Sequence, residues 1–351
     1  MGMDTLDIER GSGFLKLNDQ GLRAKLDIVL AQEDALGVDV TLPRFNTTAA
    51  AGAEQPITGR VRARLASLGR IGMFLPDLEM PRGQLDVDYQ IGGTLANPTL
   101  RGVATLADAS ANVPTLGIRV RKVRLHARAD GGRALRLDGG LASGPGEATL
   151  AGELTFDGAS AWRTNLRIDG KRLEVANISQ AWVLASPALR IAARPGWLRL
   201  EGSVDIPEAK LTPKKPQTPI SPSPDVVLIN AADAPLETRR GWTVETQVRI
   251  ALGDKIEFDG FGLTGNIIGS LVATDSTERI TTARGELRIE KGKYEAYGRK
   301  LEIERGRLLF AGGPLDTPRI DARAGRRIDE ITAGIAIARA LNWPQLRLAS
   351  A

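Results

Sequence analysis

The amino-acid sequence predicts an all-β protein whose one-sided strands form an elongated, antiparallel-rich sheet. Apolar and polar residues alternate along most of the 351-residue chain, which is typical of strands with one apolar and one polar face. Glycine is abundant, at 39 residues, as expected where many tight turns are needed. Asp-Gly pairs recur, and the positive φ angles that this dipeptide adopts favour antiparallel hairpins in series.

The clearest alternation lies between Gly285 and Arg326. Leu287 and Ile289 alternate with charged residues, and Leu301 and Ile303 do the same. Glycines separate these runs, at positions 292, 298, 306, 312 and 313. We therefore expect short, one-sided strands with no helix between them.

A one-sided sheet has to cover its apolar face. The usual cover is a second sheet or a layer of helices, which gives an ordinary sandwich or barrel core. A sheet can also curl over on itself, so that its apolar face lines a groove for a ligand with apolar tails. The residue pattern alone leaves both interpretations open.

Composition narrows the class of protein. Hydrophobic residues make up 42% and aromatic residues 4%, so the apolar face consists of Leu, Ile, Val and Ala. There is no cysteine, which excludes disulfides and thiolate chemistry, and the net charge of +5 favours anionic surfaces such as phospholipid headgroups or nucleic acid. No apolar run approaches the roughly 20 residues that span a bilayer, and no signal peptide opens the chain. If the protein acts outside the cytosol, we expect the chain to be part of a longer one.

The first segment, residues 4–45, predicts strands such as Phe14–Leu17 and Leu26–Leu30. Between residues 61 and 75 the period changes, and Pro76 ends the run. The apolar residues at helical spacing are Leu65, Leu68, Ile71, Phe74 and Leu75. This predicts one short amphipathic helix near 61–75, which either caps the sheet or gates a groove.

From Gly83 the strand pattern resumes. Asn97-Pro98 predicts a turn, and the alternation between residues 118 and 129 slips once at Arg121-Lys122, as a β-bulge would make it. The opposite face of that strand carries Arg119, Arg124, His126 and Arg128. These side chains form either a solvated outer face or a contact with anionic headgroups.

The Asp-Gly carboxylates are predicted to form turns rather than to bind metal; the pairs begin at Asp130, Asp138, Asp157, Asp169 and Asp259. Residues 210–224 are rich in proline and lysine, so we expect an extended, mobile excursion there. Strands follow it, at Val226–Ile229 and in the alternating run Val244–Ile250.

Catalytic chemistry is missing from the sequence. His126 is the single histidine, and no nucleophile–base arrangement, carboxylate couple, phosphate-binding loop or zinc spacing appears. Basic residues are not interleaved with stacking aromatics, as single-stranded nucleic-acid binding requires. We therefore expect no enzyme, no cofactor, no metal site and no nucleic-acid partner.

The stretch Gly285–Arg326 resembles the C-terminal domain of TamB, a family in the AsmA-like group of envelope proteins of diderm bacteria. The matching segments are Gly285–Leu287, Gly292–Gly298, Leu301–Phe310 and Pro314–Ala322, with weaker matches at Gly93–Gly102 and Ser223–Val227. The likeness extends roughly from residue 60 onward.

The resemblance implies a β-taco, a curled sheet with an apolar groove along its length. It further implies a periplasmic protein, anchored in the inner membrane by an N-terminal helix absent here, that pairs with the outer-membrane barrel protein TamA. The implied function is a periplasm-spanning conduit that carries phospholipid between the inner and outer membranes, its acyl chains in the groove. The alternative is a scaffold for outer-membrane protein (autotransporter) assembly and protein secretion, which pairs strands with the barrel by β-augmentation.

On this interpretation, residues 1–59 are N-terminal strands of the groove, 60–209 a TamB-like groove with the short helix, 210–225 a proline-rich mobile loop, and 226–351 the C-terminal β-taco. The run Ala338–Pro344 departs from the family's pattern, and the chain stops before the strands expected to dock on TamA. The residues predicted to line the groove are Val244, Val248, Ile250, Ile256, Phe258, Leu263, Leu287, Ile289, Leu301, Ile303, Leu308 and Phe310.

Overall fold

A computed structural model describes residues 8–30, 34–43, 45, 54–158, 161–214, 242–277, 279–296, 299–315, 317–328, 331–340 and 345–350. These residues form strands and two short 3-10 helices, which confirms the all-β prediction. Two compact units divide the chain. Unit 1 comprises Met1–Ile178, Leu184–Pro195 and Glu201–Val204, and unit 2 comprises Ser179–Val183, Gly196–Leu200 and Asp205–Ala351.

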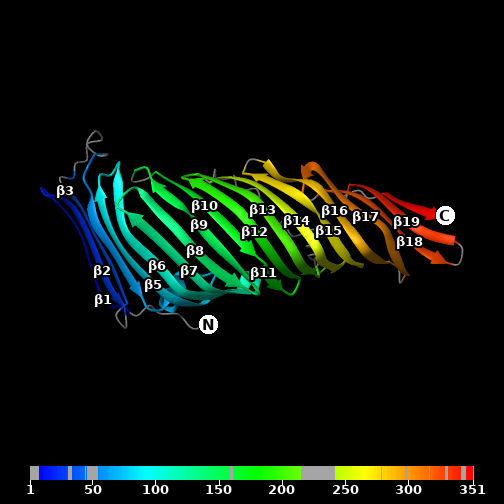
Figure 1. Cartoon of the computed structure of the whole chain (residues 1–351), viewed down its shortest axis with the longest axis horizontal. Coiled ribbons are helices and arrows are strands. Elements are labelled where there is room, and N and C mark those ends of the chain that lie inside the picture. Colours follow the sequence, from blue (N-terminus) through cyan, green and yellow to red (C-terminus); the bar gives the residue numbers. More distant parts are fainter. Residues whose placement is uncertain are drawn as a thin grey trace, which may run out of the picture. The chain divides into compact units, whose positions relative to one another are not determined.

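Unit 1 is an open antiparallel sheet in which strands β1 to β10 pair in the order of the sequence, and β12 then pairs with β10 (Figure 1). Their bounds are β1 Ile8–Asn18, β2 Gly21–Leu30, β3 Ala35–Pro43, β4 Thr58–Leu65, β5 Glu79–Gly93, β6 Pro98–Val113, β7 Ile118–Asp130, β8 Ala134–Ser143, β9 Gly146–Phe156, β10 Trp162–Lys171 and β12 Ala181–Arg194. The short strand β11 (Leu173–Ile178) contacts β7, β8 and β9, and the Ser143 hydroxyl donates to the Glu174 carbonyl at 2.7 Å.

Unit 2 repeats this arrangement. Strands β14 to β20 pair antiparallel with their neighbours in the sequence. Their bounds are β14 Thr243–Gly260, β15 Leu263–Ser276, β16 Arg279–Ala296, β17 Arg299–Pro314, β18 Arg319–Ile328, β19 Ile331–Ala340 and β20 Gln345–Ser350. The serial-hairpin prediction is therefore confirmed for these strands.

One connection breaks the antiparallel series. Strand β13 (Trp197–Leu211) begins beside the start of β14, where the Thr243 N–H donates to the Gly196 carbonyl at 2.8 Å. Further along, Gly253 lies against Pro207, and Gly260 lies against Pro213. Contacts that advance together along both strands mean that β13 and β14 run parallel. A parallel pair needs a long crossover, and the proline-rich stretch lies in the segment that supplies it.

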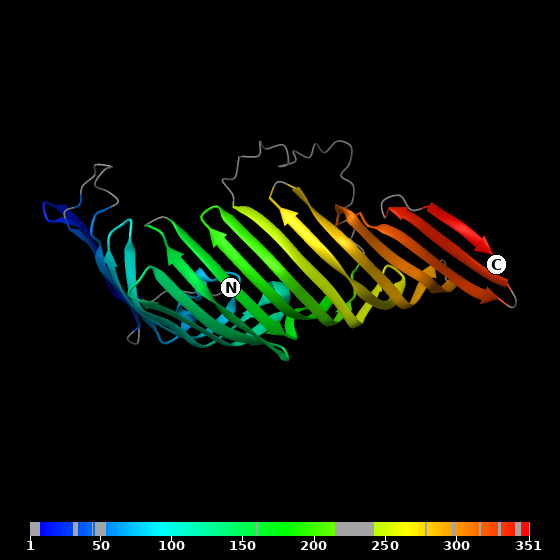
Figure 2. The same ribbon diagram turned by 45° about the horizontal axis from the view of Figure 1, so that its top comes forward.

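Bulges and glycine kinks bend the sheet, and Figure 2 shows β5 to β9 curving along their length. Asp108, Lys122 and Lys291 adopt φ angles of 49°, 51° and 51°, and register shifts accompany the first two in the β6–β7 and β7–β8 pairs. The bulge predicted at Arg121-Lys122 is therefore confirmed. Within β6, Gly102 has φ 142°, a left-handed conformation in which a Cβ would overlap the Asp88 carbonyl oxygen.

The helix predicted near residues 61–75 is shorter than expected. Residues 61–65 belong to β4, and the helix is the 3-10 helix η2, Leu68–Phe74. Val61, Ala63 and Leu65 alternate with arginines, and this signal prevails because β3 and β5 pair with β4 on both sides. No described helix has the length and apolar composition to cross a membrane.

Asp34 fixes η2 against the sheet. Its carboxylate is 1% exposed and accepts the Ala66 N–H at 2.6 Å through Oδ1. The Arg70 guanidinium lies 3.1 Å from Oδ2, as a charge contact without hydrogen-bond alignment. A buried carboxylate with a positive partner therefore holds the helix at the ends of β2 and β4.

Several turn predictions need correction. Asp130-Gly131 and Asp157-Gly158 leave their strands at turns, whereas Asp138-Gly139 and Asp169-Gly170 lie within β8 and β10, and Asp259-Gly260 ends β14 before the true turn at Phe261-Gly262. Gly292 and Gly306 likewise lie inside long strands instead of separating short ones. Glycine marks both turns and close strand approaches, and the sequence alone does not distinguish them. The predicted loop 210–225 begins too early, because β13 continues to Leu211. Residues 215–225 and the predicted strand Val226–Ile229 lie outside the described residues.

The described core is thin. More than half of the buried apolar residues are alanines, and Leu184 and Ile256 are the large apolar side chains that are fully buried. In unit 2, the substantial contacts between described elements join neighbouring strands along the sheet. Most apolar side chains are therefore only partly buried, as in a single layer and unlike the two-layer interior of a sandwich.

The kink at Gly102 yields a stability prediction. Gly102→Ala should lower the free energy of unfolding by about 2 kcal/mol, because the added methyl group meets the Asp88 carbonyl and the φ of 142° disfavours any side chain. Gly132→Ala is the matched control, since a Cβ there meets nothing within 4 Å, and it should change stability by less than about 0.5 kcal/mol. Equilibrium urea denaturation measures both, and equal effects would contradict the kink.

The Asp34 contact yields a second prediction. Asp34→Ala should cost about 3 kcal/mol, because it leaves the Ala66 N–H and the Arg70 charge without their buried partner. Asp27→Ala removes an exposed ion pair with Lys25 and should cost less than about 1 kcal/mol. Thermal unfolding of the two variants compares them, and a harmless Asp34→Ala would refute the anchoring role of this carboxylate.

Candidate functional site: an apolar sheet face in unit 2

All twelve residues predicted to line a groove lie in unit 2, on one face of its sheet. Residues directly opposite each other in an antiparallel pair project to the same side, so the strand register assigns each side chain to a face. We call this the inner face. Its predicted members are Val244, Val248, Ile250, Ile256 and Phe258 on β14, Leu263 on β15, Leu287 and Ile289 on β16, and Leu301, Ile303, Leu308 and Phe310 on β17.

The register joins these residues into rows across the strands. One row runs Ile250, Leu271, Gly285, Phe310, and a second runs Gly269, Leu287, Leu308, Ile320. A third row joins Leu263, Tyr294 and Leu301 at the other end of the strands. The apolar surface is therefore continuous from β14 to β18.

Bulges keep that surface on one side. Ile289 and Tyr294 are an odd number of residues apart, so an uninterrupted strand would turn them to opposite faces. The bulge at Lys291, with φ 51°, absorbs one residue and returns Tyr294 to the inner face. A register shift between Ile303 and Arg305 does the same in β17, so that Leu301, Ile303 and Leu308 share a face.

Burial differs between the two faces. Val248 is 9% exposed and Ile256 is 1% exposed, and the other ten predicted residues are partly buried. Their neighbours on the outer face are exposed: Arg249, Glu257, Arg288, Glu290, Glu302 and Glu304. The inner side chains thus shield one another, and most of them remain partly accessible.

Two glycines at the centre of the inner face leave space for neighbouring side chains. A Cβ at Gly292 would lie 2.8 Å from both Ile289 Cγ2 and Ile303 Cδ1, and a Cβ at Gly306 would lie 3.1 Å from Ile289 Cβ. The two isoleucines fill the space that these glycines leave. This close packing explains why glycine stands inside β16 and β17.

Sequence reasoning missed several inner-face residues. They are Leu252, Ile267, Leu271, Tyr294 and Ile320, which the register places in the same rows. Glycines at 265 and 269 interrupt the apolar alternation of β15 and hide its period. Leu263, Ile267 and Leu271 recur at every fourth residue, with Gly265 and Gly269 between them, and this spacing is the signal that would have revealed a common face.

Unit 1 has an apolar face of its own, outside the predicted set. Leu36, Val38 and Val40 on β3 oppose apolar positions on β2 and β4, and the pattern continues through β5 and beyond. The Tyr89 hydroxyl on this face donates to the Ala127 carbonyl at 2.6 Å, and burial raises the pKa of the phenol above its ordinary value. Its polar atom is therefore satisfied within the protein.

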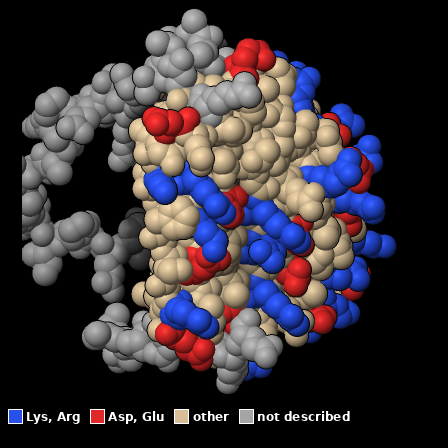
Figure 3. Space-filling model, turned by 90° about the vertical axis from the view of Figure 1, so that its left-hand side faces the viewer, with Lys and Arg blue, Asp and Glu red and all other residues tan. Residues whose placement is uncertain are grey.

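The outer face of unit 1 carries paired charges. Figure 3 shows Lys and Arg mixed with Asp and Glu on the right-hand side of that view. Arg60 makes two hydrogen bonds to Asp88, at 2.9 and 2.6 Å, and they hold the pKa of that carboxyl below its ordinary value. Arg23 lowers the pKa of Asp39 in the same way. These carboxylates are partners of arginines and remain ionised at neutral pH.

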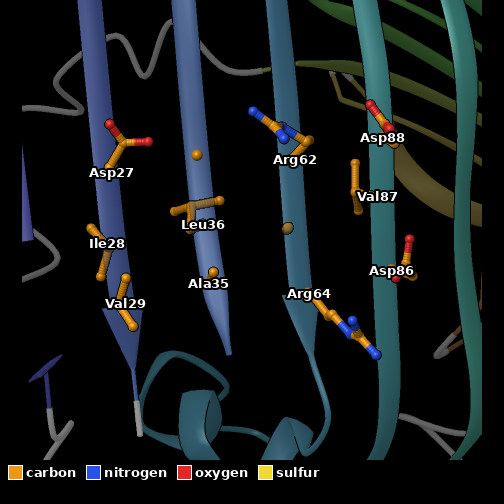
Figure 4. A pocket seen from close by; sticks show the side chains of 12 residues that line it. Asp27, Ile28, Val29, Ala35, Leu36, Arg62, Arg64, Asp86, Val87 and Asp88 are labelled. Atoms are coloured by element: carbon orange, nitrogen blue, oxygen red, sulfur yellow. The ribbon is translucent and has the colours of Figure 1, made fainter. Parts of the chain in front are cut away.

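A hollow of about 470 Å³ interrupts that outer face (Figure 4). Gly37 and Ala35 on β3 stand opposite Arg62 and Arg64 on β4, and their small size leaves the space. Asp27 closes one side, its Oδ1 lying 3.5 Å from where a Cβ of Gly37 would be. Arginine and aspartate side chains line this hollow together with Ile28, Leu36 and Val87, so it is more polar than the inner face of unit 2.

The described residues contain no group of three or more His, Cys, Asp or Glu side chains placed to hold a metal ion. The leucine, isoleucine, valine and phenylalanine side chains of the inner face are suited to contact with apolar groups. Whether its twelve predicted residues bind lipid stays a prediction at this point.

Comparison with known proteins identifies the family. The family model of the TamB C-terminal domain matches residues 138–351, which is more than half of the chain. The translocation and assembly module subunit TamB of Haemophilus influenzae is 24% identical over 308 residues, covering 83% of this chain. The match spans 24% of that relative, so the chain corresponds to about a quarter of its length. The chain belongs to the TamB family, and its C-terminal portion is a TamB C-terminal domain.

Proposed function

We propose that this chain carries phospholipid between membranes, with the acyl chains lying on the inner face. The observation that supports this most directly is the continuous apolar surface from β14 to β18, whose side chains are partly buried but remain accessible. An accessible apolar surface of this extent calls for an apolar ligand or partner.

The dimensions suit an acyl chain. Neighbouring strands lie about 4.8 Å apart, so the seven strands β14 to β20 extend over about 30 Å. One leaflet of a bilayer contributes about 15 Å of hydrocarbon, half of the roughly 30 Å core. Each buried CH₂ group contributes about 0.8 kcal/mol, which holds a two-chain lipid firmly against escape into water.

A wall of Leu, Ile and Val also permits movement. Its dispersion contacts are individually weak and similar from row to row, so no single position traps an acyl chain. Lipid held in this way can slide along the rows without leaving the surface. Transport of this kind requires no catalytic step, and we propose that the chain is not an enzyme.

Family membership supports an envelope role. The Haemophilus influenzae relative is named as a subunit of a translocation and assembly module. We propose that this chain acts in the periplasm as part of an inner-membrane-anchored protein that works with TamA. Because the match covers about a quarter of that relative, these properties belong to the proposal for the whole protein.

A second function is assembly of outer-membrane proteins. Strand β1 is exposed along its whole length, and β2 is the one strand with which it pairs among the described residues. Exposed Phe14, Leu15 and Leu17 make this edge suitable for β-augmentation by an incoming strand. The name of the relative, which includes assembly, fits this alternative as well.

Charge on the inner face tests the conduit. Ile303→Arg and Phe310→Asp should each remove most co-purified lipid, because a desolvated charge on the apolar rows opposes acyl contact. Glu302→Arg places the same new side chain on the exposed outer face and should leave lipid content unchanged. Native mass spectrometry of the full chain measures bound lipid, and far-UV circular dichroism establishes that each variant is folded.

The same measurement separates the two functions. Wild-type protein that carries lipid, with loss in folded Ile303→Arg or Phe310→Asp, supports the conduit. Lipid-free wild-type protein that instead captures unfolded outer-membrane strands through β1 supports the scaffold. Unchanged lipid content in folded inner-face variants would refute a role of this surface.

A further inference from the structure

Asp275 stands out on the inner face of unit 2. It lies opposite Thr246 in the β14–β15 pair, two residues beyond Ala273, and therefore on the same face as Val248 and Leu271. The other described side chains that β14 to β17 place in the inner-face rows are uncharged, whereas Asp275 carries a carboxylate. A carboxylate in this position is an exception to the pattern that defines the surface.

The surroundings of Asp275 leave part of it available. The Thr281 hydroxyl on β16 donates to Oδ1 at 2.9 Å. Oδ2 has no hydrogen bond or ion pair among the described side chains, although the residue is partly buried. The outer-face carboxylates Asp39 and Asp88, by contrast, each hold an arginine. A partly buried carboxylate without a cation costs desolvation energy, which a cationic ligand offsets.

Asp275 lies at one rim of the sheet. Strand β15 ends at Ser276, β16 begins at Arg279, β14 begins at Thr243 and β17 ends at Pro314, so these four strand ends lie along one edge. Two exposed apolar residues lie at that edge, Trp242 at 43% and Leu315 at 41% exposure. Ile280 precedes the inner-face Thr281 and projects to the outer face. Exposed apolar groups beside a polar anchor are typical of surfaces that meet the boundary between acyl chains and headgroups.

We infer that Asp275 receives the ammonium group of a phospholipid headgroup at this rim while the acyl chains lie along the apolar rows. This inference rests on the proposed lipid function and specifies the headgroup. A primary ammonium donates N–H bonds to a carboxylate and cancels its charge. A headgroup that carries phosphate alone offers only like charge, and a trimethylammonium group offers charge without N–H donors.

Competition between headgroups tests the inference. The full chain is equilibrated with mixed micelles of phosphatidylethanolamine, phosphatidylglycerol and phosphatidylcholine in equal amounts, and bound lipids are identified by native mass spectrometry. Wild-type protein should be enriched in phosphatidylethanolamine. Asp275→Asn should lower the ratio of bound phosphatidylethanolamine to phosphatidylglycerol roughly twofold to fivefold, as expected for one partly exposed charge pair. Total bound lipid should not change.

Two variants control the experiment. Asp259→Asn makes the same substitution in the same hairpin, but on the outer face and at the opposite end of the strands, and should match wild type. Asp275→Glu keeps the charge and should retain most of the headgroup preference. Asparagine still accepts the Thr281 hydroxyl, so the local hydrogen bond survives in Asp275→Asn.

The outcomes separate the two ideas. Lipid bound by wild-type and Asp275→Asn protein in the same headgroup ratio overturns the role of Asp275 and leaves the conduit standing. Wild-type protein that takes up no lipid overturns the conduit and the inference together. A headgroup preference that disappears in Asp275→Asn and persists in Asp259→Asn supports both.

Discussion

The register of strand pairing is the constraint on which this protein depends. Because side chains alternate between the two faces, a slip of one residue would turn every following apolar group outward. The pairs within each unit hold the register over strands of up to 18 residues, and the bulge at Lys291 and the shift between Ile303 and Arg305 add residues where the sheet bends. Curvature and a one-sided apolar surface are thus obtained together, since each bulge bends a strand and restores its alternation.

A single-layer sheet is stabilised without a deep hydrophobic core. The described residues bury mostly alanine, so the main contributions come from the backbone ladder and from cross-strand side-chain pairs. Exposed arginine–carboxylate pairs such as Arg60–Asp88 each add little, but they keep the outer face soluble. Because the sheet is a single layer, its inner face stays partly accessible. In a sandwich, a second sheet would bury that face.

Much of this architecture follows from the sequence. The alternation at Leu287/Ile289 and Leu301/Ile303 identified the inner face, and the slip at Arg121-Lys122 located a bulge. Glycine was ambiguous, because Gly292 and Gly306 serve close packing of isoleucines inside strands, whereas Gly131 serves a turn, as predicted. The parallel β13–β14 pair depends on which strands lie side by side across a long crossover, and local periodicity carries no such information.

The parallel β13–β14 pair has a higher loop-closure cost than the hairpins, which affects the order of folding steps. Hairpins between consecutive strands join residues that are close in the sequence, so each closes at little entropic cost. Joining β13 to β14 has to bring together ends separated by the whole crossover, as in the bond from Thr243 to Gly196. We expect that step to come after the hairpins, with the first edge of β14 unpaired until it is complete. The indole of Trp197, which donates to Glu245 at 3.1 Å across this junction, is a natural fluorescent reporter of its closure.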